Sequence, residues 1–452
     1  MNSIPNIFKA YDIRGLVDSE ITPDFTFATG LAFARYLQQV REPGTVVIGQ
    51  DMRPSSPALA DAFSAGVTSQ GMDVIRIGLA STDMLYFASG KLGLPGAMFT
   101  ASHNPAEYNG IKLCLSSARP IGKESGLATI ENFVRSGSPL EIRSVGVESN
   151  REMLEEYVDY LLFLVDLTSI RRLKIVVDAG NGMAGHTAPA IFNRLNCELI
   201  PLYFELDGSF PNHEANPIDS ANLVDLQKAV VKHKADLGLA FDGDADRCFL
   251  VDEKGMVVNP SDVTSLIAHR ELVKHPGSTI IYNLISSRAV LETIEENGGV
   301  GLRSRVGHSY IKKMMADSGA IFGGEHSGHF YFNDFWRADS GALAALHAIA
   351  ALGLNKNSMS EILKPYQRYV LSGEINSKVD DADATMDLIE NTFTGKGGVS
   401  IDHLDGLSVI GDTWWFNVRP SNTEPLLRLN VEAKTQAALA ALRDEVLALI
   451  RG

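Results

Sequence analysis

The chain has 452 residues, 45% of them hydrophobic, and its formal net charge at pH 7 is -15. This composition is typical of a folded protein with several domains, and the acidic balance excludes a partner such as nucleic acid or an anionic membrane held by general charge attraction. No stretch predicts a membrane span or a secretion signal, and the three dispersed cysteines suit a reducing compartment. We therefore expect a soluble cytoplasmic protein.

Strand-like and helical patterns alternate in a repeating order along most of the chain. The first unit runs from TVVIGQD at Thr45 through DVIRIG to GAMFTASHNP and GIKLCL, with helical patterns between the strands. The same order recurs from KIVVDAG to DLGLAFDGDADRCFLVD, and again from STIIYNL to AIFGGEHSGHFYF. We predict three similar α/β domains with mixed sheets, over residues 1–150, 151–254 and 255–365.

A smaller region follows from about Pro365. It contains the strand-like TWWFNVRPSNTEPLLRLNVEA and an amphipathic helical pattern at the C-terminus, which predicts a smaller α+β domain over residues 366–452.

In each of the three α/β units, a polar motif directly follows the last long strand, where α/β folds build their sites. We expect the four domains to surround one central cleft.

The segment DGDADR places three carboxylates, Asp242, Asp244 and Asp246, at the end of an apolar strand. A turning backbone can direct all three at one point, and ligation by oxygen alone favours Mg²⁺ over zinc. A solvated acidic turn is the plainer alternative, but the apolar segments on both sides disfavour it. We reject a calcium-binding EF-hand loop, because Arg247 stands at its sixth position, which needs glycine, and because strands flank the motif.

Two other loops have features of phosphate sites. DAGNGMAG contains G-x-G-x-x-G after a strand, but Asp178 would repel a pyrophosphate, so we favour a tight structural turn over a nucleotide site. RPSNTEP combines a guanidinium, two hydroxyls and backbone N–H groups, which suit a phosphate pocket, with a polar turn as the alternative. The candidate ligands in this loop are Arg419, Ser421, Asn422 and Thr423.

The turn GEHSGH places Glu325, Ser327 and His329 between apolar strands. Zinc is disfavoured because no cysteine or well-spaced third histidine joins the group. A carboxylate and a serine can contact two neighbouring sugar hydroxyls, and a histidine can move protons. A histidine with purely structural hydrogen bonds is the alternative.

Ser102, in TASHNP, has three possible roles: nucleophile, helix cap or loop serine. The G-x-S-x-G elbow of hydrolases is absent, and His103 is not expected to act as its base, because successive side chains point apart. The other motifs favour chemistry, since a serine beside a metal site and a phosphate loop is suited to carrying a phosphoryl group.

TASHNP, DGDADR, GEHSGH and RPSNTEP, together with KAYDIRG near the N-terminus, resemble the motifs of the α-D-phosphohexomutase superfamily. The resemblance extends along nearly the whole chain and is strongest to the bacterial bifunctional phosphomannomutase/phosphoglucomutases. GEHSGH stands where phosphoglucosamine mutases usually have GEQSGH, which favours hexose over hexosamine substrates. The family fold implied is four domains around a central cleft, as the repeats predict.

The resemblance also implies residue roles. Ser102 would be the phosphoserine, and Asp242, Asp244 and Asp246 would hold Mg²⁺ with a phosphoserine oxygen as a further ligand. Glu325 and Ser327 would contact the sugar. The distal phosphate would be held by Arg419, Ser421, Asn422 and Thr423. The residues that match positions near the sugar or the moving phosphoryl group are Tyr11, Arg14, Lys112, Arg247, His308 and His329.

The activity implied is an isomerase reaction that interconverts the 1- and 6-phosphates of mannose and glucose. It would pass through phosphoserine and a hexose 1,6-bisphosphate, with glucose 1,6-bisphosphate as activator. Lys112, Arg14 or a histidine such as His329 would manage the hydroxyl proton. A serine phosphatase and a phosphosugar sensor without turnover are the alternatives. The only partner we expect is a small phosphosugar, and the acidic surface favours a monomer.

Overall fold

The structure is a computed structural model that describes residues 7–137, 144–420 and 426–452. Domain 1 comprises β1 (Ile13–Leu16), α1 (Pro23–Gln39), β2 (Thr45–Gln50), α2 (Ser56–Thr68), β3 (Asp73–Leu79), α3 (Thr82–Leu92), β4 (Gly96–Phe99), β5 (Tyr108–Leu115), β6 (Arg119–Pro120), the 3-10 turn η1 (Lys123–Ser125), α4 (Leu127–Ser136) and β7 (Glu148–Asn150). Its sheet has the order β1-β5-β4-β2-β3-β7, in which β5 runs antiparallel to β1 and β4. The parallel strand β2 is buried on both faces, with Val46 and Val47 in different core clusters, which explains its continuous apolar run.

Domain 2 comprises α5 (Leu154–Leu164), β8 (Leu173–Asp178), α6 (Ala184–Phe192), β9 (Cys197–Leu202), the 3-10 turn η2 (Ser220–Leu223), α7 (Val224–His233), β10 (Leu237–Phe241) and β11 (Cys248–Asp252). The sheet order is β11-β10-β8-β9, with β8, β9 and β10 parallel and β11 antiparallel. The segment that carries the three aspartates is therefore the short connection between two buried antiparallel strands.

Domain 3 comprises α8 (Pro260–Lys274), β12 (Thr279–Asn283), α9 (Arg288–Glu296), β13 (Val300–Ser304), α10 (His308–Ser318), β14 (Phe322–Gly324), β15 (Phe330–Phe332), the 3-10 turn η3 (Asn333–Phe335), β16 (Ala338–Asp339), α11 (Gly341–Gly353) and α12 (Met359–Leu363). The sheet order is β13-β12-β14-β15-β16. GEHSGH connects the antiparallel strands β14 and β15, so it occupies the place that DGDADR has in domain 2.

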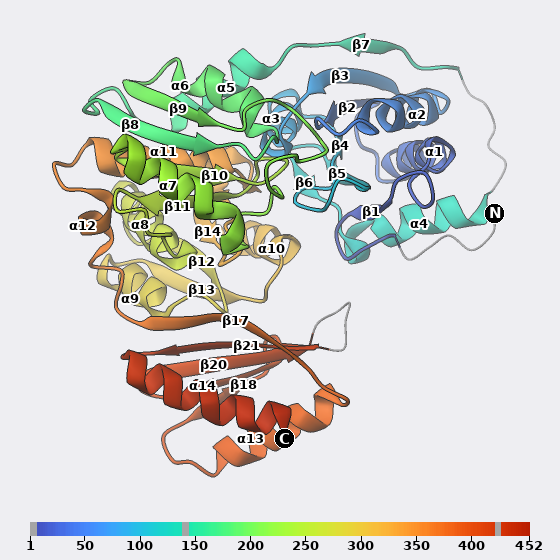
Figure 1. Cartoon of the computed structure of the whole chain (residues 1–452). Coiled ribbons are helices and arrows are strands. Elements are labelled where there is room, and N and C mark those ends of the chain that lie inside the picture. The colour runs from blue at the N-terminus through green and yellow to red at the C-terminus, as the bar shows by residue number, and fades with distance from the viewer. Residues whose placement is uncertain (1–6, 138–143, 421–425) are drawn as a thin grey trace.

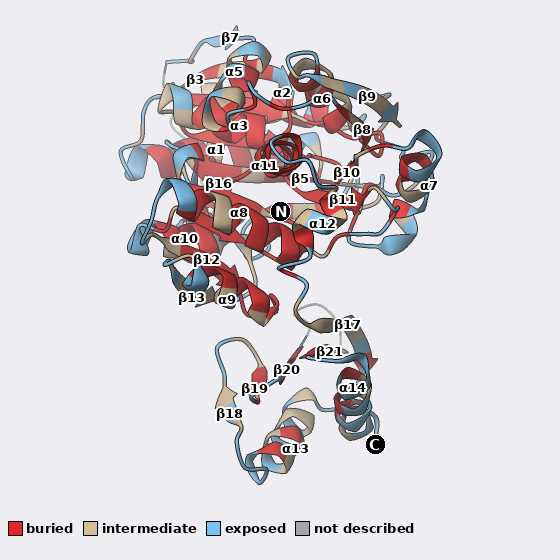
Figure 2. Ribbon diagram, turned by 90° about the vertical axis from the view of Figure 1, so that its left-hand side faces the viewer, coloured by how far each residue is buried: buried red, intermediate tan, exposed pale blue. Residues whose placement is uncertain are grey.

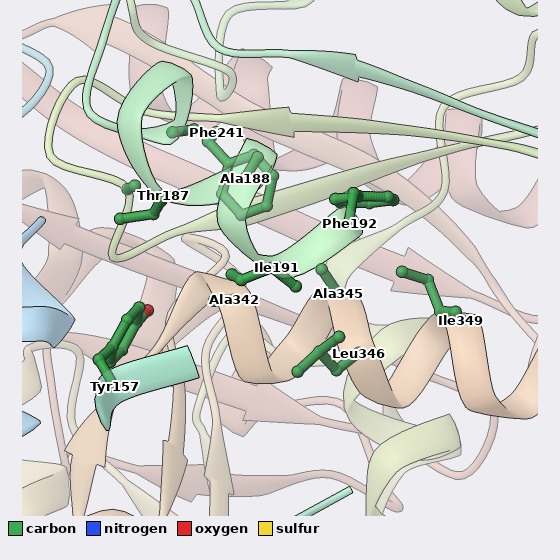
Figure 3. Close-up of a pocket in the computed structure, with 12 residues that line it drawn as sticks. Tyr157, Thr187, Ala188, Ile191, Phe192, Phe241, Ala342, Ala345, Leu346 and Ile349 are labelled. Atoms are coloured by element: carbon green, nitrogen blue, oxygen red, sulfur yellow. The ribbon is translucent and has the colours of Figure 1, made fainter. Parts of the chain in front are cut away.

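Helix α11 joins domains 2 and 3 through an apolar face. Every residue of this helix is buried, as the red ribbon at the centre of Figure 2 illustrates. Figure 3 shows Ile191 of α6 lying against Ala342 and Ala345 of α11, with Ala188 of α6 beside Phe241 at the end of β10. Ala245, in the connection that carries the aspartates, belongs to the same packed group of residues.

Domain 4 comprises β17 (Val370–Lys378), α13 (Ala382–Thr394), β18 (Ser400–Asp402), β19 (Leu407–Ile410), β20 (Trp414–Pro420), β21 (Leu426–Ala433) and α14 (Gln436–Arg451). Its antiparallel sheet has the order β17-β21-β20-β19-β18. Figure 1 shows this domain below the other three, adjoining domain 3. Leu284 and Ile285 of domain 3 form a small apolar cluster there with Trp415, and Arg288 donates to the Gly411 carbonyl at 2.8 Å.

The predicted fold class is confirmed: three α/β domains with mixed sheets precede a smaller C-terminal domain of antiparallel strands and helices. The helices begin where local chemistry places them. Thr22 accepts from the Phe25 N–H ahead of Pro23, and Ser81 accepts from the Met84 N–H at the start of α3. Within the described residues, no helix combines the length and the apolar character that crossing a membrane requires.

Candidate active site

Ser102 lies in the loop between β4 and β5, and its side chain faces the aspartate segment of domain 2. Its Oγ donates to Asp242 Oδ2 at 2.8 Å, and Arg247 Nη2 lies 3.5 Å from Ser102 Oγ. The residue is buried and has a φ of 50°, which an L-residue rarely adopts. The loop thus holds the hydroxyl in an unusual backbone conformation between a carboxylate and a guanidinium.

The expectation that His103 points away from Ser102 is wrong. Its Nδ1 lies 3.2 Å from Ser102 Oγ. Successive side chains point apart in an extended chain, whereas the positive φ of Ser102 bends the backbone so that both side chains lie on one side. Burial and the neighbouring Arg247 hold the pKa of His103 well below its ordinary value, so the imidazole is neutral.

The three aspartates form one cluster, in which a ligand oxygen from each lies within 4.8 Å of the others. All three are buried, and burial raises the pKa of Asp242 to about 7 although Arg247 Nε donates to it at 2.8 Å. Gly243 allows the segment to approach domain 1 closely, since a Cβ there would lie 2.3 Å from the Ser102 carbonyl oxygen. The phosphate-acceptor candidate and the carboxylates are therefore in direct contact across the domain boundary.

Lys112, on β5, bridges the cluster from domain 1. Its Nζ donates at 2.6 Å to both Asp244 and Asp246, and these carboxylates raise the pKa of Lys112 well above its ordinary value despite burial. Asp244 Oδ1 is buried and has no hydrogen-bond partner among the described residues. An unpartnered anionic oxygen beside two further carboxylates fits a hard cation such as Mg²⁺, which prefers oxygen ligands.

The GEHSGH turn packs against the aspartate segment. His329 pairs with Arg247 in an isolated antiparallel bridge, and its Nε2 lies 3.5 Å from Asp246 Oδ1. Its Nδ1 lies 2.9 Å from Ser327 Oγ. Burial alone would lower the pKa of His329, but Asp246 raises it above the ordinary value. Glu325 is also buried, and it accepts from Tyr331 Oη at 2.6 Å and from the Gly307 N–H at 3.0 Å.

The N-terminal motif reaches the same place. Arg14 donates to Asp12 at 2.6 Å and to the Asn104 side chain in the Ser102 loop. Burial would lower the pKa of Arg14, but Asp12 and Asp244 raise it, so the guanidinium stays charged. Desolvation raises the pKa of Tyr11, and Asp12 adds to the effect. Arg14 therefore contacts the loop that carries Ser102, and Tyr11 is close enough to Arg14, Lys112 and Glu325 to interact with their charges.

The predicted phosphate loop is described only in part. Arg419 is buried at the end of β20 and donates to Glu374 Oε2 at 2.6 Å. Burial lowers the pKa of His326 in the GEHSGH turn, an effect that Glu374 opposes and Arg419 reinforces. Arg419 therefore stands at the domain 3 boundary. Ser421, Asn422 and Thr423 lie outside the described residues, and the side chain of His308, at the start of α10, is not described.

The GNGMAG segment forms a tight turn between β8 and α6, as the sequence predicts, and it also supports the aspartate segment. The Met183 N–H donates to the Gly243 carbonyl at 2.9 Å, and a Cβ on Gly182 would lie 2.7 Å from the same oxygen. Asp178 accepts from the Gly180 N–H at 2.9 Å and so closes the turn on itself. This glycine-rich turn therefore helps to fix the position of the segment that carries the carboxylates.

Sequence reasoning missed two residues of α3 that complete the cluster. Thr82 donates from Oγ1 to Asp244 Oδ2 at 2.5 Å, and its N–H donates to the Asp244 carbonyl at 2.9 Å. Asp83 is buried where three domains meet and accepts from Tyr157 Oη at 2.7 Å and Ser340 Oγ at 2.6 Å. The only local signal is the Ser-Thr-Asp run, which is also typical of a helix N-terminus.

Comparisons with known proteins agree with this geometry. The family models described as phosphoglucomutase/phosphomannomutase alpha/beta/alpha domains I, II and III match residues 5–140, 155–255 and 259–369, and the model of the C-terminal domain matches residues 374–449. A relative named "Phosphohexose mutases" from Xanthomonas campestris pv. campestris is 40% identical over 98% of this chain and 99% of its own. A phosphomannomutase from Salmonella typhimurium is 38% identical over 97% of each chain.

A solved structure gives the same result in three dimensions. The crystal structure of a phosphoglucomutase/phosphomannomutase family protein from Burkholderia thailandensis superposes with a TM-score of 0.90 at 31% identity, covering 98% of this chain and 97% of that one. Sequence, domain order and overall structure therefore agree along the full length of the chain. The chain belongs to the phosphoglucomutase/phosphomannomutase family and is a phosphohexomutase, an isomerase.

Proposed function

We propose that this phosphohexomutase interconverts the 1- and 6-phosphates of mannose and glucose through phospho-Ser102 and a hexose 1,6-bisphosphate. The observation that carries the proposal is the position of Ser102 Oγ, 2.8 Å from Asp242 and 3.5 Å from Arg247. A phosphoryl group on that oxygen would lie between a cationic guanidinium and the carboxylate cluster. Such a site suits phosphoryl transfer, which depends mainly on positioning and on charge stabilisation.

In the first half-reaction, the free hydroxyl oxygen of a hexose monophosphate attacks the phosphorus of phospho-Ser102. The bond between phosphorus and Ser102 Oγ breaks as the new phosphorus–oxygen bond forms, and the product is the bisphosphate. After the bisphosphate reorients, Ser102 Oγ attacks the other phosphate and recovers a phosphoryl group. The sugar leaves with its phosphate moved from one carbon to the other, so phosphate is conserved.

The attacking hydroxyl must lose its proton, and we assign the acceptor role to His329. Lys112 and Arg14 are held as cations in ion pairs with aspartates, at 2.6 Å in each case, and a cation with no lone pair cannot accept a proton. His329 lies beside both the aspartates and the sugar-contact candidates. Its imidazole accepts the proton in the neutral form, and Asp246, which raises the pKa of His329, stabilises the imidazolium that results.

Asp242, Asp244 and Asp246 would hold Mg²⁺, which supplies positive charge to offset the phosphoryl oxygens when it is bound. Arg247 contributes a second, permanent cation from the chain itself. Trace glucose 1,6-bisphosphate would serve as activator, because it can phosphorylate Ser102 in any molecule that has lost its phosphoryl group.

Dual specificity follows if recognition omits carbon 2 of the sugar, the carbon at which glucose and mannose differ. Glu325 and Ser327 are the candidates for contacts to two adjacent hydroxyls, and Arg419 with Ser421, Asn422 and Thr423 for the phosphate that is not transferred. Tyr331 holds the Glu325 carboxylate at 2.6 Å and so restricts its direction. A contact set of this kind binds either epimer and accepts the bisphosphate in both orientations.

Phosphorus NMR tests the proposal directly. Mannose 1-phosphate, glucose 1-phosphate and glucosamine 1-phosphate are incubated in turn with the protein, Mg²⁺ and a trace of glucose 1,6-bisphosphate. We expect 6-phosphate from the first two sugars at similar kcat/KM and no free phosphate. Release of inorganic phosphate would indicate a phosphatase, preference for glucosamine would place the substrate in the amino-sugar class, and binding without turnover would indicate a sensor.

Ser102→Ala isolates the covalent step. Removal of the oxygen that carries the phosphoryl group is expected to abolish turnover while sugar-phosphate binding persists. Ser69→Ala, at the C-terminal end of α2, where the hydroxyl donates to the Gly66 carbonyl at 2.7 Å, is the matched control and should retain full activity. A Ser102→Ala variant that turns over at the wild-type rate would refute the phosphoserine.

A further inference from the structure

A buried arginine lies beneath the loop that carries Ser102. Arg53 follows β2 in the segment DMRPSSP, which no motif in the sequence connects with Ser102. Its side chain is fully buried, and burial lowers the pKa of its guanidinium, although Asp51 at 3.3 Å offsets part of this effect. Taking an arginine out of water is costly, so a buried guanidinium needs several good acceptors.

The acceptors are four backbone carbonyls of one loop. Nη2 donates to the carbonyls of Ser102 at 3.1 Å and Asn104 at 2.7 Å, and Nη1 donates to those of Pro105 at 2.8 Å and Tyr108 at 2.9 Å. The planar fork of an arginine matches this arrangement, and a lysine ammonium cannot reproduce it. One side chain thus fixes the loop from Ser102 to the first residue of β5.

This bracing explains how Ser102 keeps its conformation. A serine with φ of 50° is in a sparsely populated region, and such a residue persists only where its surroundings hold it. The carbonyl of Ser102 itself is held on one side by Arg53, while Gly243 packs closely on it from domain 2. Release of the Arg53 contacts therefore frees the backbone at the position that sets the direction of Ser102 Oγ.

Domain 2 covers Arg53 on its other side. The Phe210 ring lies over the guanidinium, with 5.0 Å between Cζ and the ring centroid, and a Cβ on Gly208 would lie 2.7 Å from the Arg53 Cα. A cation and an aromatic face attract each other, more strongly where both are shielded from water. Arg53 thus lies between this segment of domain 2 and the loop that carries Ser102.

We propose that Arg53 is a positioning residue for the nucleophile: it sets the geometry of Ser102 without contacting substrate, and Phe210 seats it from domain 2. The inference rests on the proposed function, since it assumes that Ser102 accepts and donates the phosphoryl group. A displacement of about 1 Å at a reacting group lowers the rate on the order of 100-fold. Because Arg53 touches no substrate group, the loss falls on kcat and leaves KM nearly unchanged.

Arg53→Ala, assayed with glucose 1-phosphate, Mg²⁺ and glucose 1,6-bisphosphate, tests this role through chemical rescue. We expect kcat to fall about 100-fold or more and KM to change less than about 3-fold. Guanidinium chloride at low millimolar concentration should fill the vacated site and restore kcat at least about 10-fold. Methylammonium chloride at the same concentration, which supplies a charge but no fork, should restore nothing.

Two further variants separate positioning from stability. Phe33→Leu, in the domain 1 core away from the loop, should lower the thermal midpoint yet retain kcat. Addition of guanidinium chloride should leave the kcat of this variant unchanged. If Arg53→Ala does not fold, Arg53→Lys keeps the charge and the stem but cannot reach four carbonyls, and it should lower kcat at least about 10-fold at unchanged KM. Wild-type kcat in either Arg53 variant would overturn the inference. A rise in KM that accounts for the whole loss of kcat/KM in Arg53→Ala would also overturn it. So would a fall of kcat in Phe33→Leu as large as that in Arg53→Ala, if the two variants lose the same amount of thermal midpoint.

The mass of the intact protein distinguishes this inference from the proposed function. Wild type from which any phosphoryl group has first been removed should gain the mass of one phosphoryl group on incubation with glucose 1,6-bisphosphate. Arg53→Ala treated in the same way should gain it far more slowly, with guanidinium restoring the rate. Phosphorylation of both proteins at equal rates would overturn the role of Arg53 alone. A wild type that never gains the group, although it turns over, would overturn the phosphoserine and the role of Arg53 with it.

Discussion

Asp83 should make the stability of the three-domain junction depend on pH. Burial raises the pKa of this carboxyl from 3.8 to about 6, against the hydrogen bonds from Ser340, Ser81 and Tyr157. The folded state thus holds its proton more tightly than the unfolded chain does. The stabilisation that this proton provides is fully present below pH 3.8 and is lost as the pH rises through 6.

The size of the effect follows from the shift. Two pKa units correspond to about 3 kcal/mol, of which about 2 kcal/mol is lost between about pH 4.5 and pH 7. Asp83→Asn does not titrate, so the variant lacks this loss. Measured against the wild type, its free energy of unfolding should therefore improve by about 2 kcal/mol on going from the lower pH to the higher one.

Urea denaturation of both proteins at the two pH values measures this difference, and the other titrating groups cancel in the comparison. Asp61→Asn provides the matched control, because Asp61 is exposed on α2 and pairs with Arg76 at the surface. Its difference from the wild type should stay constant with pH. A constant difference for Asp83→Asn as well, or one that worsens with rising pH, would refute the reasoning.

Three further predictions concern the aspartate segment and domain 4. Gly341→Ala places a Cβ 2.8 Å from the carbonyl oxygens of Ala245 and Arg247, so it should displace the aspartate segment. We expect kcat to fall about 10-fold or more and the Mg²⁺ concentration for half-maximal rate to rise. An unchanged Mg²⁺ titration would contradict this. Chelation by EDTA should abolish turnover reversibly and leave the far-UV circular dichroism unchanged, since Lys112 already offsets charge in the cluster; unfolding on chelation would disprove it. Trp415→Ala removes the aromatic side chain from the apolar cluster between domains 3 and 4, which should lower the stability of that interface by about 3 kcal/mol. Proteolysis near Tyr369 should therefore be faster than in the wild type. Cleavage at the wild-type rate would argue against this interface.

The sequence predicted the fold well because the evidence for it is local. Short continuous apolar runs marked β2, β8 and β12, and each strand stands at the same point of a repeated order. The aspartate cluster was predicted for a related reason, since three carboxylates within five residues at a strand end can converge without help from distant parts of the chain.

Contacts between domains could not be predicted in this way. Thr82 and Asp244 are 162 residues apart, and Arg53 bonds carbonyls about 50 residues away, so no spacing in the sequence marks either pair. The position of His103 beside Ser102 depends on a single backbone angle, which the residue type at that position does not favour. Where the structure departs from the prediction, the cause is a tertiary contact or a strained backbone.

The site has a consequence for the making of the molecule. Ser102, Asp242 and His329 come from three different domains. Ser102 contacts Asp242 at 2.8 Å, and His329 contacts Asp246 of the same segment at 3.5 Å. A chain that has emerged from the ribosome only as far as domain 1 has the serine but none of the carboxylates. On the proposed roles of these residues, we expect turnover to require that the three domains have docked, so that a half-synthesised or clipped chain is inert toward phosphosugars.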